Sequence, residues 1–287
     1  MVVSSAPAKI NLSLEIEGRR DDGYHLIRTV MQAVDIRETV EICRVEKPGV
    51  NLRVSGFSLP MSRDNTVYKA VEAFFEDTGI RLFGLDIKVT KRIPAGAGLA
   101  GGSADAAATL VALNEMCGCG LGTDDLCKTG AKVGADVPFC IVGGTALGTG
   151  TGTELERLPS LPDCYIVIAK PPGNVSTDKA YRLFDSAGVS FKSRAVEDGL
   201  KKGDLRAIAR GLFNNFESVI SLPGVLEIKA AMKRLGALGC QMTGSGSAVF
   251  GIFESAGLAE SCATELLEKF ETVFVCRPDC EGARIEK

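Results

Sequence analysis

The chain has 287 residues, of which 45% are apolar and 24% charged, and its formal net charge is −3. This length predicts one large or two ordinary domains with a full hydrophobic core, and the weakly acidic balance excludes a basic face for nucleic acid. The chain contains no apolar run long enough to cross a membrane and does not begin like a secretory leader. The sequence therefore predicts a cytoplasmic protein without a membrane partner.

The ten cysteines are scattered along the chain, and in a chain of this length and a reducing compartment we expect free thiols. Two pairs lie close in sequence, Cys117 with Cys119 and Cys276 with Cys280, but neither has the spacing or the histidine support of a zinc site. Because His25 is the single histidine, a histidine triad or a multi-histidine metal centre is excluded. We predict no metal site built by protein side chains.

The first half of the chain predicts strands followed by helices. From Val2 to about Val54 apolar and polar residues alternate, which predicts strands. Residues 65–78 then place apolar side chains at helical spacing, with Asn65 as the N-cap and Gly79 as the stop. Residues 85–94 return to strand alternation, and after a glycine-rich loop residues 103–116 predict an alanine-rich helix.

Prolines on both sides of the apolar segment CYIVIA predict a domain boundary near Glu154 to Pro162. We assign residues 1–155 to an N-terminal domain and residues 156–287 to a C-terminal domain. The second half predicts five helices, at residues 177–186, 196–201, 205–209, 225–235 and 258–270, and three strands, at residues 165–169, 248–253 and 272–277. The pattern is that of an α+β protein of two domains without internal repeats.

A glycine-rich loop lies between the predicted strand and the alanine-rich helix. Four glycines fall within seven positions from Gly96 to Gly102. Glycine permits positive φ and close approach of backbone N–H groups to an anion, and the helix that follows adds the positive end of its dipole. We therefore predict a phosphate-binding loop made of Pro94, Ala95, Gly96, Ala97, Gly98, Leu99, Ala100, Gly101, Gly102, Ser103 and Ala104.

Two polar residues at the start of the helix have more than one interpretation. Ser103 either caps the helix or turns its hydroxyl toward a phosphate or a metal held by phosphates. Asp105 is expected in the first helical turn, where the helix dipole stabilises a carboxylate, and a magnesium role is the less favoured interpretation.

The same glycines match GxGxxG, which is typical of dinucleotide-binding oxidoreductases. Such a unit requires a second strand that ends in an acidic residue about 20 positions on. Asp124 and Asp125 fall near that distance but open another helical stretch, so the oxidoreductase is the weaker alternative. The Walker motif and the signature set of the protein kinases are absent as well.

Three separated segments together resemble the GHMP kinase superfamily of small-molecule kinases. They are APAKINLSL (6–14), PAGAGLAGGSADAA (94–107) and QMTGSGSAVFGIF (241–253). The resemblance implies ATP and Mg²⁺ as cofactors and a two-domain α+β fold. In that fold the N-terminal domain has a left-handed βαβ crossover and the C-terminal domain is ferredoxin-like.

Two further segments, DDGYHLIRTVMQAVD (21–35) and GADVPFCIVGGTALGTGTG (134–152), resemble those members that phosphorylate a cytidine diphosphate-linked polyol. This narrower resemblance implies a small-molecule substrate and an enzyme that is a monomer or a weak homodimer. A mevalonate-type or homoserine-type kinase remains the alternative.

The resemblance also implies the residues of the site. Lys9 and Asp136 match the catalytic pair, and Asn11 matches a neighbouring polar residue. The residues implied for the substrate are, at its cytidine end, Tyr24, His25 and Tyr181, and, in a second glycine loop, Gly244, Ser245 and Gly246. The chemistry suits phosphoryl transfer, because a carboxylate can accept the hydroxyl proton while an ammonium stabilises the developing charge.

Each of these residues also has an ordinary structural interpretation. Lys9 could be a solvated residue of an edge strand, and Asp136 a turn residue ahead of Val137 and Pro138. His25 could bond to backbone in a turn, and Tyr24 could pack in the core.

Overall fold

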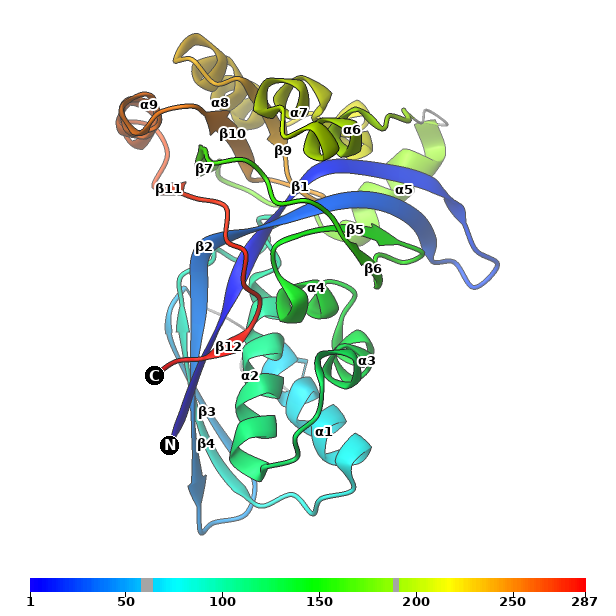
Figure 1. Cartoon of the computed structure of the whole chain (residues 1–287), viewed down its shortest axis with the longest axis vertical. Helices are drawn as coiled ribbons and strands as arrows, with labels where there is room; N and C mark the ends of the chain where they lie inside the picture. The colour runs from blue at the N-terminus through cyan, green and yellow to red at the C-terminus, as the bar shows by residue number, and fades with distance from the viewer. Residues whose placement is uncertain (58–63, 188–190) are drawn as a thin grey trace.

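The computed structural model describes residues 1–57, 64–187 and 191–287, which form two sheets flanked by helices (Figure 1). The first sheet contains β1 (Val2–Arg19), β2 (His25–Val45), β3 (Val50–Gly56), β4 (Gly84–Lys91), β5 (Thr145–Thr149), β6 (Glu154–Arg157), β8 (Phe213–Asn214) and β12 (Arg284–Ile285). The second sheet contains β7 (Tyr165–Lys170), β9 (Gly239–Met242), β10 (Val249–Phe253) and β11 (Thr272–Cys276). This mixed architecture confirms the predicted α+β class.

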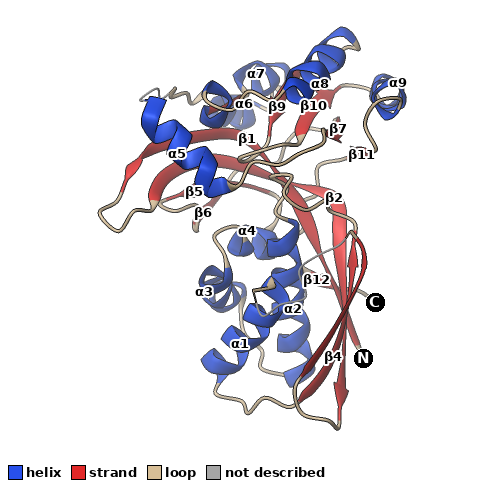
Figure 2. Cartoon of the chain, turned by 180° about the vertical axis from the view of Figure 1, so that it is seen from behind, coloured by secondary structure: helices blue, strands red, loops and turns tan. Residues whose placement is uncertain are grey.

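Four helices pack on one face of the first sheet (Figure 2): α1 (Thr66–Thr78), α2 (Gly101–Cys117), α3 (Thr123–Val133) and α4 (Val137–Val142). Helix α1 begins and ends as predicted, because the Asn65 side chain accepts a hydrogen bond from the amide of Val67 and Gly79 closes the helix with a φ of 67°. β3 and β4 are parallel neighbours joined by α1. This unit is the crossover for which the resemblance implies a left hand, and its hand stays a prediction.

The second sheet has the order β11-β7-β10-β9 with every pair antiparallel. Numbered along the chain this order is 4-1-3-2, as in a ferredoxin-like domain, which the resemblance had implied. The helices of this half are α5 (Thr177–Ala187), α6 (Ala195–Lys202), α7 (Leu205–Gly211), the 3₁₀ turn η1 (Asn215–Ser218), α8 (Pro223–Arg234) and α9 (Ala256–Leu267). All five predicted helices and all three predicted strands are present, with ends shifted by a few residues.

The long strand β1 belongs to both halves of the molecule. Its residues from Ala6 to Leu12 pack into the core of the first sheet, whereas Leu14 and Ile16 pack with the second core. At its two ends β1 pairs with segments distant in sequence, antiparallel to β12 through Ser4 and parallel to β8 through Ser13. The assignment of residues 1–155 and 156–287 to two domains stays a prediction.

Several short elements were not predicted from the sequence. Helix α4 has six residues, and β8 and β12 have two residues each. β5, β6 and β9 have four or five residues each. In segments this short a period is hard to recognise, although β10 and β11, with five residues each, were predicted.

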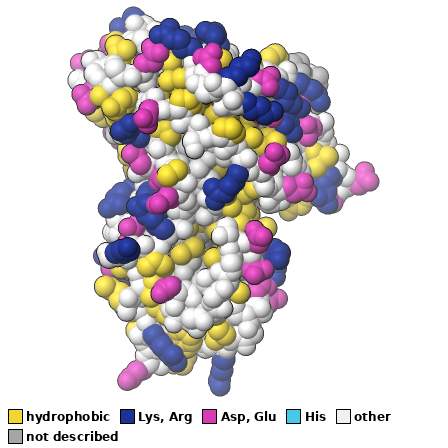
Figure 3. All heavy atoms as spheres, viewed as in Figure 1, with side chains coloured by type: hydrophobic (Ala, Val, Ile, Leu, Met, Phe, Trp, Pro, Cys, Tyr) yellow, Lys and Arg dark blue, Asp and Glu magenta, His cyan; other side chains and the backbone are white. Residues whose placement is uncertain are grey.

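The surface carries both signs of charge. Figure 3 shows basic and acidic side chains intermingled over the viewed face of both halves. In the parts of the chain that the structure describes, no helix is long and apolar enough to cross a membrane.

Candidate active site

The two glycine-rich loops meet backbone to backbone. A Cβ placed on Gly98, which has a φ of +76°, would lie 2.1 Å from the Thr243 carbonyl oxygen and 3.4 Å from the Cα of Gly244. The Ala248 amide donates to the Ala97 carbonyl at 3.2 Å. The loop of the first half and the loop of the second half therefore form one continuous surface.

The phosphate-binding loop runs directly into α2. Ala100 adopts the left-handed conformation with a φ of 60° and its side chain makes no cap. Because the first amides of a helix have no acceptor within it, the N–H groups of Gly101, Gly102 and Ser103 are suited to an anion. Ser103 is the third residue of α2, so the interpretation of Ser103 as the cap is wrong.

Lys9 lies in β1 beside this junction. Its amide donates to the Leu99 carbonyl at 3.2 Å, and its ammonium donates to Asn11 Oδ1 at 2.7 Å and lies 3.8 Å from Asp136 Oδ2. Lys9 is only 4% exposed, so the interpretation as a solvated edge residue is wrong. A buried ammonium needs partners of this kind.

Asp136 immediately precedes α4 but does not cap it, since its side chain makes no hydrogen bond to the helix. The Asp136 side chain is 41% exposed. Its carboxylate therefore faces the buried Lys9 ammonium and is open to a second molecule. This geometry fits a group that accepts a proton from a bound hydroxyl.

Asn11 connects β1 to the second glycine loop. Asn11 Oδ1 accepts hydrogen bonds from the Gly244 amide at 2.9 Å and from Thr243 Oγ1 at 3.2 Å, besides the one from Lys9. Asn11 Nδ2 donates to Thr29 Oγ1 at 2.8 Å. The carboxamide oxygen is saturated by protein donors, so Asn11 holds Lys9 and the loop in a fixed relation.

The residues expected at the cytidine end lie at the turn of the β1–β2 hairpin and on helix α5. The rings of His25 and Tyr181 are stacked with centroids 4.1 Å apart, and His25 Nε2 lies 2.7 Å from Asp185 Oδ1. Burial, with a smaller contribution from Asp136, raises the pKa of Tyr181 to about 12. Tyr24 is 67% exposed, so the interpretation of Tyr24 as a core residue is wrong.

His25 is bonded to a carboxylate, so its interpretation as a turn histidine held by backbone is wrong. Tyr181 also packs edge-on against Phe216, with ring centroids 5.0 Å apart. Asp185 was not predicted as a site residue, because it is one of several polar residues of α5 and belongs to no motif. Tyr24, which directly precedes His25 in the chain, thus presents an exposed ring.

Three buried charged residues lie beneath the phosphate-binding loop. Lys91 Nζ is 2.5 Å from Glu38 Oε1 and 2.7 Å from Asp105 Oδ2, and all three side chains are at most 1% exposed. Asp105 is the fifth residue of α2, so its expected place in the first turn is wrong. This cluster of Lys91, Glu38 and Asp105 was not found from the sequence, since its members are far apart in the chain.

Two other neighbours of the loops were also missed. Thr243 Oγ1 donates to the Gly98 carbonyl at 3.1 Å, and the Asn174 side chain lies against Gly96. Ser245 in the second loop pairs with Thr177, hydroxyl to hydroxyl at 3.3 Å. A TG or GN dipeptide by itself signals only a turn.

Replacing Gly98 by Ala is expected to disrupt the junction of the two loops. The new Cβ would collide with the Thr243 carbonyl and force a left-handed conformation on alanine, with a cost of about 1–3 kcal/mol. Thermal unfolding and nucleotide affinity should both fall. Gly257→Ala in α9 is the matched control, because a Cβ there meets nothing within 4 Å; wild-type behaviour of Gly98→Ala would contradict the prediction.

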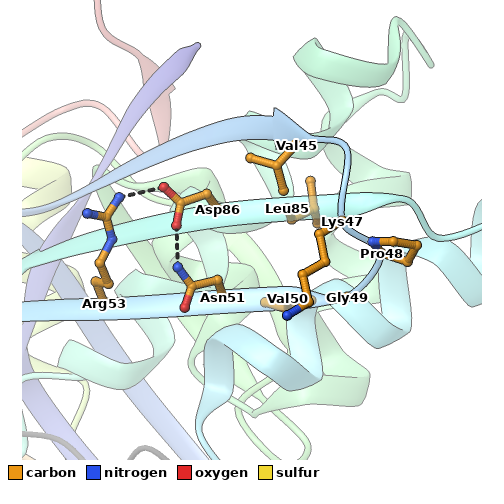
Figure 4. A pocket seen from close by; sticks show the side chains of 9 residues that line it. All are labelled: Val45, Lys47, Pro48, Gly49, Val50, Asn51, Arg53, Leu85 and Asp86. Carbon is orange, nitrogen blue, oxygen red and sulfur yellow. Dashed lines mark hydrogen bonds and ion pairs between the residues drawn. The ribbon is translucent and has the colours of Figure 1, made fainter.

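Other kinds of site find no support in the described residues. All ten cysteines are free, as predicted, and in the described ranges no three His, Cys, Asp or Glu side chains are grouped as metal ligands. A hollow at the turn between β2 and β3 is shown in Figure 4. Three of its polar side chains bond to one another, because Asn51 and Arg53 both donate to Asp86.

Known proteins resemble this chain over nearly its whole length. A 4-diphosphocytidyl-2-C-methyl-D-erythritol kinase from Clostridium beijerinckii is 39% identical over 276 residues, which cover 95% of this chain and 98% of the relative. The protein of the same name from Pelotomaculum thermopropionicum is 41% identical over 282 residues, which cover 96% and 98%.

Solved structures give the same picture. The crystal structure of a 4-(cytidine 5'-diphospho)-2C-methyl-D-erythritol kinase superposes with a TM-score of 0.80 at 31% identity, over 96% of this chain and 99% of the other. A homoserine kinase from Cytophaga hutchinsonii has a TM-score of 0.78 at 24% identity, over 99% and 97%, and shares the fold.

Family models match both halves of the chain, each of which supplies one of the two glycine-rich loops. Residues 65–144 match the GHMP kinases N terminal domain, and residues 196–272 match the GHMP kinases C terminal. The strand that a Rossmann unit would need is absent between α2 and α3, which removes the oxidoreductase alternative. Together with the relatives at about 40% identity, these matches show that the chain belongs to the GHMP kinase family.

Proposed function

We propose that the chain is a cytoplasmic ATP-dependent kinase that phosphorylates the 2-hydroxyl of 4-diphosphocytidyl-2-C-methyl-D-erythritol in the non-mevalonate isoprenoid pathway. One observation carries the chemical part of the proposal. The Lys9 ammonium and the Asp136 carboxylate lie 3.8 Å apart, next to the junction of two glycine loops. The names of the relatives support the choice of substrate.

The first step is binding of the triphosphate. The amides from Gly96 to Ser103 and the N-terminus of α2 supply donors that are fixed before the nucleotide arrives. Mg²⁺ on the triphosphate would neutralise phosphate charge. The second glycine loop, Gly244 to Gly246, closes over the acceptor side.

The transfer step uses the charged pair. Asp136 accepts the proton of the attacking hydroxyl, and Lys9 stabilises the oxygen as charge develops on it. Asn11 holds the Lys9 ammonium at 2.7 Å, so the ammonium is oriented without the help of substrate. Positioning of this kind is the largest contribution that a kinase makes to phosphoryl transfer.

The cytidine end would lie at the β1–β2 hairpin. Tyr24 offers an exposed ring, and the stacked pair of His25 and Tyr181 forms the adjoining wall. Cytosine stacks on aromatic rings, and polar groups of His25 can contact its edge. With the cytidine placed there, the polyol would extend toward Asp136. The Asp136 charge contributes, after burial, to the raised pKa of Tyr181.

The function is tested by a coupled assay of ADP formation with a panel of acceptors. We expect turnover with 4-diphosphocytidyl-2-C-methyl-D-erythritol and none with mevalonate or homoserine. Turnover confined to mevalonate or homoserine would leave the kinase chemistry but overturn the substrate. Absence of ADP formation with every acceptor, in protein that is folded by circular dichroism, would overturn the kinase itself. Gel filtration of the same preparation, with measurement of the molar mass of the eluted species, tests the expected monomer or weak homodimer.

Replacing Tyr24 by Ala is expected to weaken binding of the cytidine substrate specifically. Stacking of a base on an aromatic ring is worth about 1–3 kcal/mol, so KM for this substrate should rise by about tenfold while KM for ATP stays unchanged. Because Tyr24 is exposed, stability should not suffer. Tyr24→Phe keeps the ring and is the matched control; an equal rise of KM in Tyr24→Phe, or none in Tyr24→Ala, would contradict the stacking role.

A further inference from the structure

The cluster of Lys91, Glu38 and Asp105 holds both ends of the phosphate-binding loop. At the entry, Glu38 accepts hydrogen bonds from the Arg92 amide at 2.8 Å and the Ile93 amide at 3.1 Å. At the exit, Lys91 donates to the Gly101 carbonyl at 3.1 Å and to Asp105 at 2.7 Å. The loop from Pro94 to Ala100 is therefore anchored at its base by one set of charges.

The charges of this cluster do not balance. One ammonium lies between two carboxylates in a buried site, which leaves a net charge of −1 when both carboxylates are ionised. A buried charge without a counter-charge is costly. A single proton on the cluster would make it neutral.

The proton belongs on Asp105 rather than on Glu38. Burial raises the pKa of Glu38 as well, but two amide donors and the Lys91 ammonium act against this shift and favour its ionised form. Asp105 receives only Lys91 on Oδ2, and its buried Oδ1 makes no hydrogen bond within the described ranges. Burial is the main cause that raises the pKa of Asp105, to about 7, while Lys91 lowers it and Glu38 raises it.

We propose that Lys91, Glu38 and Asp105 act as a positioning unit for the nucleotide loop, and that this unit takes up a proton when a triphosphate binds. The proposal rests on the proposed function, because it takes the loop to be the triphosphate site. The amides of Gly101 to Ser103 lie within one helical turn of Asp105, and the Lys91 ammonium is 3.3 Å from the position of a Cβ on Gly101. An anion bound there disfavours a second negative charge on Asp105.

The groups around Asp105 and its end of the loop come from four elements. Lys91 on β4 and Glu38 on β2 are its charged neighbours. On α4, burial raises the pKa of the Cys140 thiol, so this group adds no charge near the cluster. The charges of Asp136 and Lys9 also act on the pKa of the Cys140 thiol, the first raising it and the second lowering it. From α1, the uncharged Thr66 hydroxyl donates to the Gly102 carbonyl.

The sign of the pH effect follows from the direction of the shift. At pH 6 Asp105 is protonated and the cluster is neutral, whereas above pH 7 the cluster becomes negative and repels the triphosphate. Affinity for ATP should therefore fall as pH rises through 7. Binding of ATP should be accompanied by proton uptake at pH 7 to 8 but not at pH 5.5. The same raised pKa makes folding stability decrease as pH rises from about 4 to about 7.

The test is calorimetric titration with magnesium AMP-PNP, in Tris and in MOPS, of the wild type, Asp105→Asn and Asp125→Asn. The two buffers differ in ionisation enthalpy, so the difference in heat gives the protons taken up. A rise of one unit in the Asp105 pKa gives about half a proton per nucleotide near pH 7.5. We expect this uptake in the wild type and in Asp125→Asn, which changes an exposed carboxylate of α3, but not in Asp105→Asn.

Kinetics supply a second readout. KM for ATP should rise about tenfold from pH 6 to pH 9 in the wild type and stay flat in Asp105→Asn, while KM for the acceptor follows one profile in both. Asp105→Asn keeps the side-chain shape and removes the excess charge, so its thermal stability at pH 8 should equal or exceed that of the wild type. Equal proton uptake in wild type and Asp105→Asn would overturn this inference alone, whereas no nucleotide binding by the wild type would overturn the proposed function with it.

Discussion

Replacing Asp136 by Asn is expected to lower kcat by about 10²–10⁴, with KM for both substrates almost unchanged. Asparagine has the shape of aspartate but cannot accept the proton of the acceptor hydroxyl. Asp136 makes no cap to α4 and its side chain is 41% exposed, so the substitution should not cost stability. Single-turnover measurements of ADP formation would show whether the chemical step is the one that slows.

The control for this prediction is Asp163→Asn. The Asp163 carboxylate is fully exposed and pairs only loosely with Arg277, at 3.4 Å. That variant should keep wild-type kcat. If Asp136→Asn retained kcat as well, the hydroxyl would lose its proton to solvent or to the phosphate, and Asp136 would have no role as a base.

Replacing Lys9 by Met is the second change with a large expected effect, a loss of about 10²–10³ in kcat. Methionine fills the same buried space but carries no charge to stabilise the transferring group. Asn11 Oδ1 would keep its bonds from Thr243 and the Gly244 amide, so the second glycine loop should stay in place. Circular dichroism and thermal unfolding of the variant would verify this.

Lys128→Met, on the exposed face of α3, is the matched control for loss of a lysine charge. The double variant Lys9→Met with Asp136→Asn should be far less impaired than the product of the two single losses, because the residues act as a unit. Independent, multiplicative losses would mean that the 3.8 Å pair has no joint function.

Those parts of the candidate site that lie within one sequence motif could be predicted from the sequence. Four glycines fall within seven consecutive positions from Gly96 to Gly102, so their phosphate-binding potential can be recognised without a structure. Lys9 and Asp136 came from resemblance, and the structure brings their side chains together across 127 positions of sequence. Their roles as catalytic residues stay predictions that the variants above will test.

Other parts of the site could not be predicted because they arise only from packing. The sequence predicts Asp105 in the first helical turn, yet its partners Lys91 and Glu38 come from two strands whose pairing is not visible in the sequence. Ser103 has the residue type of a cap, but α2 begins two residues earlier, at Gly101, because Ala100 takes the left-handed conformation. Short strands such as β8 and β12 form only through pairing with the edge of β1.

The participation of β1 in both halves has a consequence for how the chain acquires its structure during synthesis. β1 is made early, but its neighbours β8 and β12 lie at residues 213–214 and 284–285, so parts of its edges remain open while most of the polypeptide is still being translated. Unpaired edges invite association with other chains. A nascent fragment that stops near residue 155 should therefore depend on a chaperone.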